Sequence, residues 1–218
     1  MGGKYQPAEE YLIQTEPAVR NLFGNLEQYD AILRKIKFPI FTPSHTSRVA
    51  ADAAFKKWQR GNRAAYKRAV GRQREYLGYR FSIGTLCGSI LQIADMGIRI
   101  YSKNRTVPSE FSLIIKPGLS RYCIGRRVRE VPIGLIIYAA RNQYAHWDEK
   151  ERLKEVNECV FNTLATKHGM KGAEGIKDPA FDLNNKKILI YATNVFSMLG
   201  WWNGYDRYIA DMKALLTL

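Results

Sequence analysis

The sequence predicts an all-α protein, and three observations lead to that expectation. Apolar residues recur at the three- and four-residue spacing of a helix along most of the 218 residues. Proline, glycine and short polar residues stand at the ends of these periodic segments, where helices begin and end. No internal repeat, low-complexity tract or Pro/Gly/Ser-rich linker divides the chain. We therefore expect a single domain, a helical bundle with additional helices over residues 1–218, with residues 1–45 as an optional N-terminal helical extension.

The N-terminal third predicts two helices. Thr15-Glu16-Pro17 is typical of a helix start, because proline is tolerated in the first turn, and Pro39 ends the apolar pattern that follows. A second helix is expected from about Ser47 to Tyr76. One narrow stripe of that helix is basic, and it consists of Lys56, Arg60, Arg63, Lys67 and Arg74. The opposite stripe is apolar, with Ala51, Ala54, Trp58, Ala65, Ala69 and Tyr76, and Gly61 and Gly71 weaken the helix enough to indicate a bend.

The rest of the chain continues the helical pattern. Residues 81–102 are apolar with small residues mixed in, which predicts a buried helix, and Phe111–Ile115 in the proline-bearing stretch 103–120 is either a short strand or a packed loop. Pro132 suits the first turn of a helix over 131–147. Asp148-x-x-Glu151 resembles a capping box that opens another helix, which His168-Gly169 closes. A polar loop over 170–185 then precedes a final helical region with Trp201-Trp202 in its core or at an interface.

Charge favours a polyanionic partner. The net charge is +14 and the isoelectric point is near 9.7. The segment from Arg34 to Arg80 contains thirteen Lys or Arg residues but only two acidic residues, Asp52 and Glu75. Like charges at helical spacing repel, so the basic stripe is best explained if a phosphate backbone covers it, and we expect it to bind RNA. The plain alternative is a solvated helix face. A second basic cluster follows, made of Arg121, Arg126, Arg127 and Arg129.

Several classes of protein are disfavoured. The first residues contain no apolar signal core, and the longest apolar run, Val131–Ala140, is too short for a bilayer, so we expect a soluble cytoplasmic protein with no membrane partner. The cysteines Cys87, Cys123 and Cys159 form neither a disulfide framework nor a zinc spacing. With no HExxH, CxxC or Walker loop either, we expect neither a metal nor another cofactor.

The segment Arg141-Asn142-Gln143-Tyr144-Ala145-His146 carries the chemistry. Asn142 and His146 are four residues apart and share a helix face, and the long Arg141 side chain reaches the same place. An arginine can grip a phosphate with two hydrogen bonds, and an imidazole can give or take a proton near neutral pH. The plain alternative is a helix-capping arginine and a surface histidine. His45 and His168 have no partner at a useful spacing.

This segment resembles the R-x4–6-H signature of the HEPN superfamily, with the polar residue which that family favours directly after the arginine. The resemblance covers the motif and its flanking helices. It implies a compact helical domain, a metal-independent ribonuclease, and a role as a toxin or phage-defence effector with an antitoxin or other regulatory partner. By position, Arg141, Asn142 and His146 would be the catalytic residues. One HEPN subgroup, paired with nucleotidyltransferase antitoxins, has a tyrosine where this chain has Asp148, which disfavours that subgroup.

Metal-free cleavage by the RNA 2′-hydroxyl needs a base, an acid and positive charge on the phosphorane. One chain supplies one motif histidine, so we expect a homodimer in which two copies form a composite cleft with the 131–147 helix near the two-fold axis. Tyr144 and Trp147 either stack a base or, as we favour, pack in the core or dimer interface. The rival hypothesis is a non-catalytic helical RNA- or DNA-binding protein in which the motif is structural.

Overall fold

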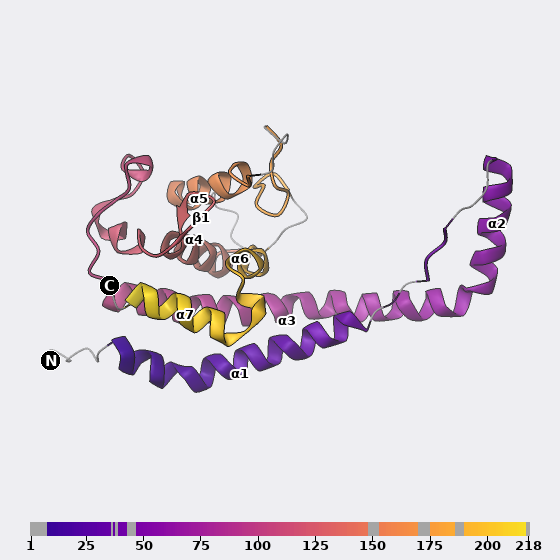
Figure 1. The fold of residues 1–218 in the computed structure, drawn as a ribbon, viewed down its shortest axis with the longest axis horizontal. Helices are drawn as coiled ribbons and strands as arrows, with labels where there is room; N and C mark the ends of the chain where they lie inside the picture. Colours follow the sequence, from indigo (N-terminus) through magenta and orange to yellow (C-terminus); the bar gives the residue numbers. More distant parts are fainter. Residues whose placement is uncertain are drawn as a thin grey trace. The chain divides into compact units, whose positions relative to one another are not determined.

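The computed structural model describes residues 8–35, 37, 39–42, 47–147, 153–169, 175–185 and 190–216. The predicted all-α class is confirmed (Figure 1). The α-helices are α1 (Ala8–Arg34), α2 (Arg48–Gly61), α3 (Arg63–Tyr101), α4 (Ile133–Ala145), α5 (Glu155–Thr166), α6 (Ala192–Leu199) and α7 (Tyr205–Leu216). Short 3-10 turns are η1 (Ser109–Phe111), η2 (Pro117–Tyr122) and η3 (Trp201–Asn203). Within the described residues the only strands are β1 (Arg127–Val128) and β2 (Val131–Pro132), an antiparallel pair.

The chain forms two compact units. The larger unit comprises Met1–Gly24 and Gly84–Leu218, and the smaller unit comprises Asn25–Ile83. Helices α1 and α3 each contribute residues to both units. The assignment of residues 1–218 to a single HEPN-like domain stays a prediction.

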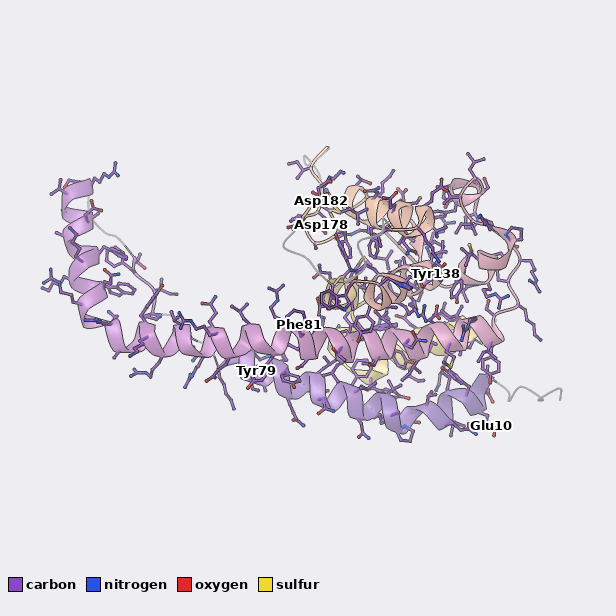
Figure 2. All side chains as sticks on the ribbon, turned by 180° about the vertical axis from the view of Figure 1, so that it is seen from behind. Glu10, Tyr79, Phe81, Tyr138, Asp178 and Asp182 are labelled. Carbon is purple, nitrogen blue, oxygen red and sulfur yellow. The ribbon has the colours of Figure 1, made fainter. Side chains whose placement is uncertain are left out.

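Helix α4 lies at the centre of the larger unit. It packs against α5, α6, η2 and β2, and nearly every residue of its first two turns is buried. Figure 2 labels Tyr138 on this helix, and its ring lies 4.7 Å from that of Tyr122. Because the sequence of α4 is apolar almost all around, the helix can be stable only inside a core.

Aromatic side chains join α1 to the two C-terminal helices of the larger unit. The Phe23 ring lies 6.0 Å from Phe196, 6.2 Å from Tyr205 and 5.7 Å from Tyr208. Trp201 is fully buried against Tyr208, as expected for a core residue, whereas its neighbour Trp202 is 37% exposed. The C-terminal helices are therefore part of the core.

The first predicted helix begins earlier than expected. The proposed start at Thr15-Glu16-Pro17 is wrong, because α1 begins at Ala8 and contains Pro17 in its interior. Proline removes one backbone hydrogen bond, which leaves the carbonyl of Ile13 without its helical donor. Ile13 is 68% exposed, so water can replace that donor, while Glu9 and Glu10 favour the true first turn.

The helix predicted over 47–76 is in fact two helices. Ser47 is the N-cap of α2, and its hydroxyl accepts a hydrogen bond from the Ala50 N–H at 3.2 Å. The break falls at Asn62, directly after Gly61, and no break occurs at Gly71. The Asn62 backbone N–H and its side-chain amide both donate to the Trp58 carbonyl at 2.9 Å, which ends α2. The buried helix expected over 81–102 is the second half of α3.

The structure also describes the stretch Phe111–Ile115 and the helix that follows the motif. Phe111 and Ile115 are buried in a turn that begins with η1, so this stretch is a packed loop and not a strand. The capping box Asp148-x-x-Glu151 and residues 170–174 of the predicted loop lie outside the described residues. Helix α5 starts at Glu155 and ends at Thr166, and Gly169 adopts a φ of 72° just beyond it, in line with the predicted stop.

Within the described residues, one helix passes the length and composition test for a membrane span. That helix is α3, and 56% of its most apolar window is buried inside the protein. Such burial is typical of a helix that packs in a protein core.

Candidate functional site

The motif lies at the C-terminal end of α4. Arg141 and Asn142 are in its last turn, and His146 is the C-cap, whose backbone N–H donates to the Asn142 carbonyl at 3.1 Å. The predicted position of His146 at a helix end is therefore confirmed. His146 is exposed to solvent, whereas Arg141 and Asn142 are half-buried. All three predicted catalytic residues thus lie in the last turn and C-cap of one helix.

The Arg141 guanidinium is fixed by α3 and by its own neighbour. Its Nε donates to Gln92 Oε1 at 2.5 Å, and its Nη1 donates to Asn142 Oδ1 at 3.0 Å. Asp95 Oδ2 lies 4.0 Å from Arg141 Nε. The Arg141 side chain is nevertheless 28% exposed. A guanidinium held in one orientation and still reached by water is suited to bind an anion.

Asp95 is a buried carboxylate beside the motif. It is 4% exposed, and its Oδ1 has no hydrogen-bond partner among the described residues. Burial raises the pKa of the Asp95 carboxyl, although a hydrogen bond with Tyr122 and the nearby Arg141 and Arg99 charges act in the opposite direction. Burial is the largest of these causes because little water reaches the carboxyl.

Sequence reasoning did not identify Gln92 and Asp95. They are polar residues three positions apart in the otherwise apolar helix expected over 81–102. Two polar side chains on one face of a buried helix signal a buried partner. The partner itself, Arg141, is 49 positions from Gln92 in the sequence, which is why local spacing did not indicate it.

The other motif residues have packing contacts. Gln143 is buried, and its Oε1 accepts a hydrogen bond from the Tyr191 N–H at 2.9 Å, which ties α4 to the start of α6. The Tyr144 ring lies against Gly88 of α3, so closely that a β-carbon there would be 2.4 Å from the ring. Trp147 is 41% exposed. Tyr144 therefore serves packing, while Trp147 remains accessible at the end of α4.

The second basic cluster is engaged inside the larger unit. Arg126 donates two hydrogen bonds to the buried Asp211, both at 2.9 Å, and Arg129 donates to Asp178 at 2.7 Å. Arg127 pairs with Glu110, and Arg121 donates to the Arg99 carbonyl. Figure 2 labels Asp178 in the segment that follows α5. These cations hold segments together, which leaves them poorly placed to bind a phosphate chain.

The basic stripe contrasts with that cluster. Lys56 and Arg60 lie on α2, and Arg63, Lys67 and Arg74 lie on α3, so the break at Asn62 divides the stripe between two helices. All five side chains are exposed. No ion pair within the described part of the chain involves any of them. The stripe belongs to the smaller unit and the Arg141–His146 motif to the larger unit.

The other two histidines lie outside the motif. His45 lies outside the described residues, and a ring nitrogen of His168 is 2.7 Å from the Ile176 carbonyl oxygen. Across the described ranges, no group of three or more His, Cys, Asp or Glu side chains is placed to hold a metal ion.

Comparisons with protein-family models, with curated proteins and with solved structures each found no match to this chain.

Proposed function

We propose that this protein is a metal-independent endoribonuclease of the HEPN type. The observation that carries the proposal is the presence of a fixed, water-accessible Arg141 and an exposed His146 at the same helix end. Asn142 supports the same site because its side-chain oxygen Oδ1 accepts a hydrogen bond from Arg141, which leaves its side-chain NH2 group as the donor for a ribose or phosphate oxygen.

The proposed reaction needs only these side chains and the RNA itself. One His146 imidazole takes the proton of a 2′-hydroxyl, whose oxygen attacks the adjacent phosphorus. The bond from phosphorus to the 5′-oxygen breaks, and a second His146 imidazolium gives that oxygen a proton. The products are a 2′,3′-cyclic phosphate and a 5′-hydroxyl. Arg141 neutralises the extra negative charge of the phosphorane as it forms.

A composite cleft between two copies of the chain supplies the second histidine. The first two turns of α4 are buried within the larger unit, so they cannot face another chain. The cleft must therefore be built from the end of α4, where Asn142, His146 and Trp147 reach the surface. This narrows the predicted two-fold contact from the whole 131–147 helix to its C-terminal end.

The biological role is proposed from the resemblance alone. A ribonuclease of this type would act on cellular RNA in the cytoplasm as a toxin or phage-defence effector, and an antitoxin or other regulatory partner would hold it in check. The subgroup paired with nucleotidyltransferase antitoxins remains disfavoured by Asp148.

The second candidate function is a non-catalytic RNA-binding protein. It is favoured by the hydrogen bonds that Arg141 already makes to Gln92 and Asn142, because an arginine with a purely structural role would be bound in the same way. In that case the basic stripe would bind RNA and the motif would only join α3 to α4.

Incubation of the purified protein with mixed RNA, with and without EDTA, separates the two candidates. The nuclease proposal expects cleavage that survives EDTA, leaves cyclic phosphate ends, and is lost in both His146→Ala and Arg141→Ala. The matched controls are His168→Ala and Arg105→Ala, which change a histidine and an exposed arginine away from the motif. Binding without cleavage would support the second candidate, whereas near-full cleavage by either motif variant would refute the assignment of the catalytic residues.

A further inference from the structure

The smaller unit contains an aromatic pocket. The rings of Phe41, Phe55 and Trp58 lie 5.3–5.8 Å apart, with Phe55 and Trp58 nearly parallel at 20°. The pocket has a volume of about 520 Å³, and Arg60, Arg63 and Tyr66 also line it. This volume falls within the range of about 300–1,000 Å³ that is typical of ligand sites.

These aromatic side chains are not a closed core. Helix α2 has no buried residue, and Phe55 and Tyr66 remain 42% and 53% exposed. Flat rings that face solvent in a formed pocket are available to stack against another flat group.

The charge of the smaller unit narrows the class of ligand. Residues 25–83 hold thirteen Lys or Arg residues against Glu27, Asp30, Asp52 and Glu75. Two members of the basic stripe, Arg60 and Arg63, are also in the pocket wall. A ligand that matches both features must be a polyanion with flat rings along its length. Nucleic acid has this chemistry, while an acidic peptide supplies the charge without the rings.

We propose that the pocket of Phe55 and Trp58 stacks an unpaired base of single-stranded RNA, while Arg60 and Arg63 contact the phosphates on either side. The identity of the strand as RNA rests on the proposed function, whereas the stacking mode does not. In a duplex both faces of each base are covered by neighbouring bases, so a paired strand cannot enter. The remaining stripe residues Lys56, Lys67 and Arg74 continue the phosphate contacts along α2 and α3.

The test measures RNA binding by a variant that lacks the proposed catalytic histidine. Full-length protein carrying His146→Ala is titrated into a fluorescently labelled, unstructured single-stranded RNA and into the matching duplex. Phe55→Ala is expected to weaken single-strand binding about tenfold and to leave duplex binding unchanged. Phe81→Ala is the matched control, since Phe81 is a 52% exposed phenylalanine of α3, labelled in Figure 2, outside the pocket.

Two further variants keep the test decisive if Phe55→Ala does not fold. Phe55→Tyr retains a ring and should bind as the parent does, while Phe55→Leu retains apolar bulk without a ring and should bind weakly. Equal binding by the leucine and tyrosine variants, tighter binding to the duplex, or equal Phe55-dependent binding of an acidic peptide would overturn the proposal. The assay measures binding and not cleavage. Failure of the base-stacking proposal would therefore be seen here, whereas failure of the nuclease proposal would be seen only in the cleavage assay.

Discussion

Asp95 Oδ2 lies 4.0 Å from Arg141 Nε, so a buried carboxyl of α3 faces the guanidinium of the motif on α4. Gln92, one turn earlier on α3, accepts a hydrogen bond from the same nitrogen. The proposed phosphate-binding arginine is therefore oriented by a helix remote in sequence. This arrangement makes α3 part of the site although no residue of α3 belongs to the motif.

Gln92→Ala should lower RNA cleavage by about 10- to 100-fold, because the freed Arg141 side chain no longer holds the phosphate in one geometry. The loss should fall mainly on kcat, with a smaller effect on KM, as steady-state kinetics on a short RNA would measure. Gln92→Glu keeps an acceptor and should restore most of the activity. The control is Gln73→Ala, an exposed glutamine of α3, and a Gln92→Ala enzyme with parental kcat would refute the positioning role.

The stability of the protein should depend on pH through Asp95. Burial raises the pKa of this carboxyl above its ordinary 3.8, so between the two values the folded chain holds a proton that the unfolded chain has released. The free energy of unfolding must then fall as pH rises through that window. Asp95→Asn removes the titration. Urea unfolding at a series of pH values should show the parent losing stability relative to the variant from about pH 4 upward, until the folded carboxyl ionises.

Asp206→Asn is the matched control for that measurement, since Asp206 is an exposed carboxyl on α7. If the difference between parent and Asp95→Asn instead grew in favour of the parent as pH rose, the folded carboxyl would be stabilised as an anion, contrary to its burial.

Gly88→Ala should destabilise the larger unit by about 1–3 kcal/mol. The new β-carbon would lie 2.4 Å from the Tyr144 ring, so α3 and α4 would have to separate or the ring would have to move. The added cost should largely disappear in the Tyr144→Ala background, which a double-mutant cycle of thermal unfolding would reveal. Gly78→Ala on the same helix has open space around it and should stabilise by about 0.5–1 kcal/mol. Equal effects of the two substitutions would contradict the close packing.

RNA binding by the basic stripe should weaken steeply with salt. For single strands, the logarithm of the binding constant falls by about 0.7 per phosphate contact for each unit of log salt concentration. Lys67→Ala and Arg74→Ala should each reduce that slope by about one contact and weaken binding to all sequences alike. Filter binding at several salt concentrations provides the measurement, with the exposed Lys103→Ala of the larger unit as control. If the slope were unchanged in one of these variants, the side chain that was removed would be solvated in the parent protein and would make no phosphate contact.

Local patterns predicted much of the fold. The helical period predicted the buried helix over 81–102 and a helix that starts at about Ser47, and the segment after the motif predicted that His146 lies at a helix end. These signals act within one or two turns. The break at Asn62 was missed because its side chain competes for a helix carbonyl, and the early start of α1 because Pro17 is tolerated in the helix interior.

In the candidate site, too, the sequence predicts relationships within one helix but not contacts between helices. The grouping of Arg141 with His146 follows from spacing on one helix, so the sequence could indicate it. The contacts of Arg141 with α3 and of Arg126 with Asp211 join residues 49 and 85 positions apart. Such contacts depend on how the helices pack, and the charge count alone could not separate engaged cations from the exposed ones of the stripe.

The burial of α7 has a consequence for when the proposed cleavage could begin. Tyr208, Met212 and Leu215 are buried in the same compact unit as α4, and Asp211 binds Arg126 just before that helix. During translation the ribosome makes residues 205–216 long after His146. A nascent chain therefore holds its motif on an unfinished core, so the proposed cleavage of RNA would begin only after α7 has been synthesised.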